Sequence, residues 1–340
     1  MRAPSLGGAR LLLALAAGAL VVSVGSTAAA FRSTSENGGD FVTAAPDFRA
    51  PTVSAAAIGK TQGGATGFVK KGGTYFVYAN VSDSGNPASG TASVRANLGN
   101  LTLGATSVPL SPGSYSAGGQ AFNYRSAQQT AGAALVEGPV GYTIETVDVA
   151  GNAATTNWSA SVDNAPPTAS DVQATNTSGG TAGRAEQGDT VTFVYSEPVE
   201  AESILAGWSG GPTPVVVRIT TGVALLGGLL KEGEGLQVFD ASNATALPLG
   251  AIDLKQQYVA KTLALLTGTM TFGAGGTPST MSISGGVVTI VLGTRAGNNA
   301  LTVTTPGAMS WVPTATPYDR AANPASTVAA SESGPADVEF

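Results

Sequence analysis

The stretch from Tyr142 to Thr168, YTIETVDVAGNAATTNWSASVDNAPPT, constrains the fold of this chain more than any other stretch. Side chains alternate between two faces over residues 142–147 and again over residues 156–162, which is typical of half-buried β-strands. Pro166 and Pro167 then end the second strand, because proline lacks an amide donor and has a fixed φ. The pattern predicts a hairpin that closes one all-β domain before another begins.

A polar turn over residues 148–152, DVAGN, joins the two predicted strands. Gly151 and Asn152 tolerate a positive φ, and the carboxylate of Asp148 can accept hydrogen bonds from amides further along the turn. The hairpin, its turn and the prolines resemble the end of a bacterial immunoglobulin-like (Ig-like) domain. Residues 319–323, DRAAN, repeat the same frame near the end of the sequence.

Two other segments carry the same resemblance. Residues 111–127, SPGSYSAGGQAFNYRSA, are similar to a segment of actinobacterial-type Ig-like repeats. Residues 188–199, GDTVTFVYSEPV, resemble the second strand of the SbsA-type bacterial Ig-like domain, with Tyr195 in place of the usual phenylalanine. The resemblance implies a β-sandwich for each of two domains.

Composition agrees with short strands joined by many turns, because 46 residues are glycine, 43% are apolar and only 11% are charged. We therefore predict an all-β chain with two tandem Ig-like antiparallel β-sandwiches after an N-terminal signal peptide. The expected organisation is a signal peptide at 1–30, a flexible leader at 31–50, Ig-like domain 1 at 51–164, Ig-like (SbsA-type) domain 2 at 165–325 and a disordered tail at 326–340.

Period-two patterns predict most strands of both domains. In domain 1 the predicted strands are 52–57, 75–81, 91–98, 101–110, 120–126, 140–149 and 154–162. In domain 2 they are 188–199, 214–220, 236–240, 270–272, 281–284 and 287–292, with one helical turn or an irregular crossing over 201–208. Apart from the strand at 236–240, the structure of residues 222–262 is left open, because the leucine- and glycine-rich run over 223–231 fits a short helix and a glycine-interrupted strand equally well.

Residues 1–30 have the layout of a secretory signal. Basic residues precede an apolar run over 11–22, and small residues follow, so that Ala28 and Ala30 predict cleavage before Phe31. An N-terminal anchor that is retained is the alternative. The region also resembles the SipW-dependent type of signal known from biofilm-matrix fibre subunits, on Phe31, Asn37, Phe41 and Thr43. We expect a protein that is secreted, extracellular or held at the cell surface.

The sequence contains no cysteine and no histidine. A Ser-His-Asp or Cys-His nucleophile, a histidine metal ligand and a disulfide are therefore excluded within it. The net charge of −6 argues against binding to a phosphate backbone, so nucleic acid is not an expected partner.

Oxygen ligands give one candidate metal site. Asp148 and Asn152, with Asp163 and Asp83 near the same end of the sandwich, could hold calcium, which takes six to eight hard oxygen ligands. The alternative, which the turn sequence favours, is that Asp148 only braces the hairpin turn. No other cofactor is expected.

Two other groups of residues are candidates for other functions, namely glycoside hydrolysis and sugar binding. The acidic residues Glu197, Glu200, Glu202 and Asp189 could serve glycoside hydrolysis if two carboxylates faced each other in a cleft, although a solvated loop is the favoured interpretation. Three tryptophans could stack on sugars if they were exposed. We expect Trp158 in the core, while the sequence leaves Trp208 and Trp311 undecided.

The function expected from these features is that of a secreted or cell-surface structural or adhesive Ig-like module without catalytic activity. The partner would be an unidentified extracellular protein or glycan, and exposed strand edges would permit self-association. A carbohydrate-binding accessory module and a self-assembling extracellular matrix subunit are the alternatives.

Overall fold

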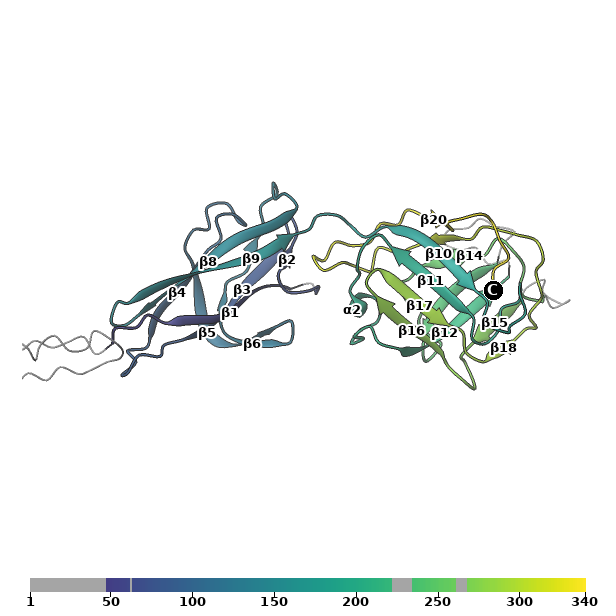
Figure 1. Ribbon diagram of the computed structural model, residues 1–340, viewed down its shortest axis with the longest axis horizontal. Coiled ribbons are helices and arrows are strands. Elements are labelled where there is room, and N and C mark those ends of the chain that lie inside the picture. Colours follow the sequence, from purple (N-terminus) through teal and green to yellow (C-terminus); the bar gives the residue numbers. More distant parts are fainter. Residues whose placement is uncertain (1–46, 62, 222–233, 261–267) are drawn as a thin grey trace, which may run out of the picture. The chain divides into compact units, whose positions relative to one another are not determined.

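The computed structural model describes residues 47–61, 63–221, 234–260 and 268–340, and these residues are almost entirely β-structure (Figure 1). The strands form two large sheets, one from residues 52–162 and one from residues 169–331. The predicted all-β class with two sandwich domains is confirmed. The signal peptide, with Ala28, Ala30 and Phe31, and most of the expected leader lie outside the described residues.

The first sheet follows the order β1-β3-β6-β5-β4-β8-β9-β2, with β7 beside β3. Its strands are β1 (Thr52–Lys60), β2 (Phe68–Val69), β3 (Thr74–Ser82), β4 (Thr91–Asn97), β5 (Val108–Ala117), β6 (Gln120–Ser126), β7 (Gln129–Thr130), β8 (Gly138–Asp148) and β9 (Ala153–Val162). β5 pairs with β4 through Val108 and Pro109 and with β6 from Leu110 onward, so it joins the two halves of the sheet. Side chains from both halves, among them Tyr75 and Ile144, form one buried core.

The second sheet follows the order β10-β11-β17-β16-β12-β13-β14-β19-β20, with β15 paired to β12 and β18. Its strands are β10 (Ala169–Thr175), β11 (Thr190–Tyr195), β12 (Thr213–Thr220), β13 (Gly235–Asp240), β14 (Ala251–Asp253), β15 (Thr269–Phe272), β16 (Ser279–Ser284), β17 (Val287–Val291), β18 (Arg295–Gly297), β19 (Ser310–Val312) and β20 (Ala330–Ser331). The two ends of this order meet, because the N–H of Ser333 after β20 donates to Asp171 Oδ1 in β10 at 2.8 Å.

Trp311 in β19 occupies the core that this closure creates. Its side chain is fully buried, and its ring contacts Phe193 and Tyr195 edge-on at centroid distances of 5.2 and 4.9 Å. The indole N–H donates to the carbonyl of Leu249 at 2.7 Å, which satisfies its one polar atom. The helical turn expected near residue 201 is present as α2 (Ala201–Ile204).

One predicted strand is wrong. Residues 101–110 were expected to be extended, but Leu101 lies in a turn, where its N–H donates to the carbonyl of Leu98 at 2.8 Å. The strand begins at Val108 and runs through Pro112 with a break in register before Tyr115. Leu101 misled the prediction because it is buried, and a buried turn residue imitates one step of a period-two pattern.

The predicted disordered tail at 326–340 is also wrong. β20 pairs with β19, and the ring of Phe340 packs edge-on against Tyr258 at a centroid distance of 5.2 Å. The composition of this segment is polar, yet it adds a short strand to the sheet. Long-range pairing of this kind leaves no local signal in the sequence.

The structure also describes residues 47–50 of the expected leader and residues 234–260 of the region left open by the sequence. Asp47 lies in the expected flexible leader, yet its side chain is only 2% exposed, so this residue is packed and not solvated. Within 222–262 the structure describes 234–260, which hold β13 and β14. Among the described residues no helix has the length and apolar character needed to span a membrane.

Candidate functional site

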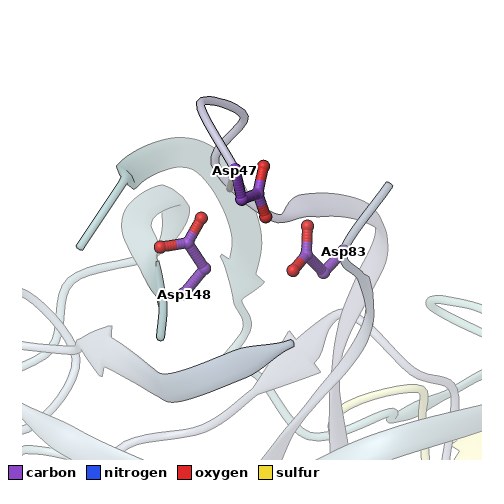
Figure 2. A group of neighbouring side chains, drawn as sticks. All are labelled: Asp47, Asp83 and Asp148. Carbon is purple, nitrogen blue, oxygen red and sulfur yellow. The ribbon is translucent and has the colours of Figure 1, made fainter. Parts of the chain in front are cut away.

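Three aspartates gather at one end of the first sheet. Asp47 precedes β1, Asp83 follows β3 and Asp148 ends β8, and one carboxylate oxygen of each lies within 4.8 Å of the others (Figure 2). We call these residues the first carboxylate cluster. Residues 47–52, 82–93 and 146–154, which carry the three side chains, pack together as a compact unit.

Backbone N–H groups of the loops hold the carboxylates of Asp47 and Asp83. Asp47 accepts from Arg49 at 2.9 Å and from Ser89 at 2.8 Å, one bond on each oxygen. Asp83 accepts from Gly90 at 2.7 Å. The N–H donors of Arg49 and then of Ser89 lower the pKa of Asp47 below its ordinary value, because they favour the charged form.

Asn152 fastens the hairpin turn to the segment before β1. Asp148 accepts from the backbone N–H and from the side-chain amide of Asn152, both at 2.7 Å. The same side-chain nitrogen donates to the carbonyl of Asp47 at 3.1 Å. Gly151 has a φ of +91°, which lets the chain turn back so that Asn152 can reach Asp148. The expected bracing role of Asp148 is therefore present in the geometry.

The same arrangement recurs where the chain enters the second domain. Asp163, Glu197 and Asp319 form the second carboxylate cluster, with one oxygen of each within 4.8 Å of the others. Asp319 accepts from the N–H and the side-chain amide of Asn323, both at 2.7 Å, and that amide donates to the carbonyl of Asp163 at 3.0 Å. Ala322 has a φ of +65° at the position of the glycine in the first turn. The two turns thus fold alike despite this difference.

The two clusters divide the residues that the sequence grouped as one calcium site. Asp83, Asp148 and Asn152 come together as expected, whereas Asp163 belongs to the second cluster. Sequence reasoning missed Asp47. The sequence does contain a signal for it, because the pattern D-x-x-x-P-T occurs at residues 47–52 and again at 163–168. The first copy ends at the first residue of β1, and the second ends one residue before β10.

In the second cluster, burial and neighbouring negative charges outweigh the hydrogen-bond donors, whereas in the first cluster the donors lower the pKa of Asp47. Burial, and then the charge of Asp319, raise the pKa of Asp163. Burial, and then the charges of Asp163 and Asp319, raise the pKa of Glu197 to about 7. Both shifts have the sign expected where like charges converge away from water.

Each cluster presents a donor set that fits a hard divalent cation. The ligands are carboxylate oxygens at a spacing that a calcium ion can bridge, and further ligands would have to come from carbonyls or water. The oxygens of the first cluster also serve as hydrogen-bond acceptors for loop amides. The same contacts therefore brace the loops without an ion.

The acidic residues proposed for hydrolysis do not form one group. Asp189 is fully buried at the start of β11 and accepts N–H bonds from Thr177 at 2.8 Å and Glu186 at 2.6 Å. Glu197 follows the other end of β11, and Glu202 accepts from the hydroxyl of Tyr318 at 3.2 Å. Glu197 converges with Asp163 and Asp319 instead of the acids near it in sequence.

The tryptophans are placed for packing. Trp311 is fully buried and Trp208 is 8% exposed, with its indole N–H donating to the carbonyl of Gly211 at 2.6 Å. Trp158 is half-buried against the first core, and its N–H donates to Thr156 Oγ1 at 2.9 Å. Neither Trp208 nor Trp311 offers the exposed ring face that stacking on a sugar requires.

Comparison with known proteins finds no family model that matches this chain and no curated protein with significant similarity to it. The fold defines the chain as an all-β protein of two sandwich domains.

Proposed function

We propose that this chain is a secreted or cell-surface structural or adhesive module without catalytic activity, built from two Ig-like domains. The observation that carries the proposal is the repeated fastening of each domain's leading segment to its D-x-x-x-N turn, through Asn152 in one domain and Asn323 in the other. These hydrogen bonds restrict the motion of the segment by which the chain enters each domain. Such rigidity is useful in a module that acts as a spacer or bears mechanical load.

The chemistry of the first carboxylate cluster supports the same proposal. General acid catalysis on a sugar needs a pair of carboxylates on either side of a bond, one protonated and one ionised. In the first cluster both oxygens of Asp47 accept backbone N–H bonds, which favour its ionised form and lower its pKa. A carboxylate held in this way braces a loop and is a poor proton donor.

Sedimentation velocity on the full chain and on the chain from Phe31, with and without calcium chloride, tests the proposal. A monomer whose sedimentation is independent of concentration supports a spacer or display module. Growth into large species with rising concentration supports the alternative of a matrix subunit that assembles through strand edges. Hydrolysis of a panel of polysaccharides, lost in a Glu197→Gln variant, would overturn the non-catalytic assignment.

A further inference from the structure

A third group of acids lies in the segment that was expected to be disordered. Glu332, Asp337 and Glu339 each place one carboxylate oxygen within 4.8 Å of the other two. We call them the third carboxylate cluster. It does not share a residue with the two repeated clusters.

Glu339 distinguishes this cluster from the others. Its side chain is fully buried, and neither carboxylate oxygen has a hydrogen-bond partner among the described residues. The carboxyl group of Glu332 and the amide of Ala174 are near enough to shift the pKa of Glu339, but neither meets the geometry of a hydrogen bond to it. A buried carboxylate without a partner is costly unless a positive charge or a proton neutralises it.

Protein cations do not supply that charge. The two ion pairs that the described residues form are Arg184 with Glu186 and Lys255 with Asp253, and neither involves the third cluster. Burial first, and then the neighbouring carboxyl groups of Glu332 and Asp337, raise the pKa of Glu339 above its ordinary value. The site therefore disfavours its own negative charge.

Backbone pairing holds the cluster in place. The N–H of Glu332 donates to the carbonyl of Met309 at 2.9 Å, and the N–H of Met309 returns a bond to Glu332 Oε2 at 3.1 Å. Asp337 exchanges two backbone bonds with Gly307, at 2.8 and 3.2 Å. The same segment, residues 307–309, therefore fixes the exposed Asp337 and the largely buried Glu332 beside Glu339 before any ligand binds.

We propose that Glu332, Asp337 and Glu339 bind a calcium ion, with both oxygens of Glu339 as ligands. A proton shared between two carboxyls would give a partner to only one oxygen of Glu339, whereas calcium accepts both oxygens of a carboxylate. The spacing agrees, since ligands on opposite sides of calcium lie about 4.6–5.2 Å apart at Ca–O distances of 2.3–2.6 Å. The ion would attach the last strand and the residues after it to the body of the second domain.

Thermal unfolding of the full chain in EDTA, calcium chloride and magnesium chloride tests this site. At about a hundredfold excess of calcium over its Kd, we expect the Tm of the second domain to rise by roughly 5–10 °C, with a smaller effect of magnesium. Glu339→Gln keeps the shape and removes the unpartnered charge, so it should fold and lose the calcium response. Asp337→Asn, on an exposed residue, should weaken the response, and Glu197→Gln is the matched control that should keep it.

Terbium luminescence excited through tyrosine gives a local readout, because the hydroxyl of Tyr258 donates to the carbonyl of Glu339 at 3.3 Å. The signal should appear in the wild type and in Glu197→Gln and disappear in Glu339→Gln. No calcium response in the wild type, or a Tm that depends on pH alone, would overturn the proposal in favour of a shared proton. A response lost in Glu197→Gln and kept in Glu339→Gln would assign calcium to the second cluster and would equally overturn it.

Discussion

Replacing Asp148 with alanine measures what the first carboxylate cluster does. The variant removes two hydrogen bonds from Asn152, each to a charged acceptor that is 2% exposed. Bonds to charged groups contribute about 1.5–3 kcal/mol each, so roughly 3–6 kcal/mol is lost. The variant also removes repulsion from Asp47 and Asp83, which is worth about 1 kcal/mol per pair when water screens it.

The expected net cost is about 1–4 kcal/mol, which lowers the Tm of the first domain by roughly 4–16 °C. Urea unfolding followed by circular dichroism, in EDTA and in calcium chloride, gives the free energy of unfolding. If the turn braces the loops as described, the cost is the same with and without calcium. The cost should rise in about 1 M salt, where the Debye length is about 3 Å and the repulsion that the variant relieves is already screened.

Asp319→Ala is the matched control, because Asp319 makes the same two bonds to Asn323 in the second domain. It should lower the stability of the second domain by a similar amount and leave the first domain unchanged. A cost below about 0.5 kcal/mol for Asp148→Ala in EDTA would refute the bracing argument. A cost that appears only with calcium would show that the cluster works through a bound ion.

Three further predictions concern the core, the pH dependence and the signal. Trp311→Ala should destabilise the second domain by about 3–5 kcal/mol, since it empties the centre of the core; calorimetry should show the second transition shifted and the first unchanged. Glu197 has a folded pKa of about 7 against an ordinary value of 4.5, so its ionisation opposes folding. This penalty is absent below pH 4.5, grows as the pH rises toward 7 and is complete above it; Glu197→Gln should flatten that part of the stability curve, and an unchanged curve would contradict the assignment. For the signal, Ala30→Asp should block cleavage before Phe31 in a secreting bacterial host, and N-terminal sequencing of the secreted protein should find Phe31 only in the wild type.

Much of the local structure followed from the sequence. β6 (Gln120–Ser126) has the predicted bounds, and β9 differs from the prediction by one residue at its start. The hairpin turn was predicted with its Asp148 brace, because donor and acceptor are four residues apart and need no other part of the chain. Leu101 was placed wrongly because burial in a turn and burial in a strand look alike in a short sequence window.

The clusters could be predicted only in part. Asp83 and Asp148 were expected near one end of the sandwich, yet Asp47 and the membership of Asp163 depend on which loops meet at which end. The D-x-x-x-P-T repeat marks both residues in the sequence, but nothing local says that their carboxylates face a D-x-x-x-N turn more than a hundred residues away.

The sequence by itself determined the period-two strands, the turns that glycine and asparagine permit, and the absence of histidine and cysteine chemistry, because each of these depends on a residue and its near neighbours. Tertiary structure alone decided that Glu339 is buried without a partner and that the segment from residue 326 onward is ordered. The reason is physical: closing the second sheet through Ser333 and Asp171 joins residues 162 positions apart, and such pairing is selected by the whole core and not by the pattern of either strand.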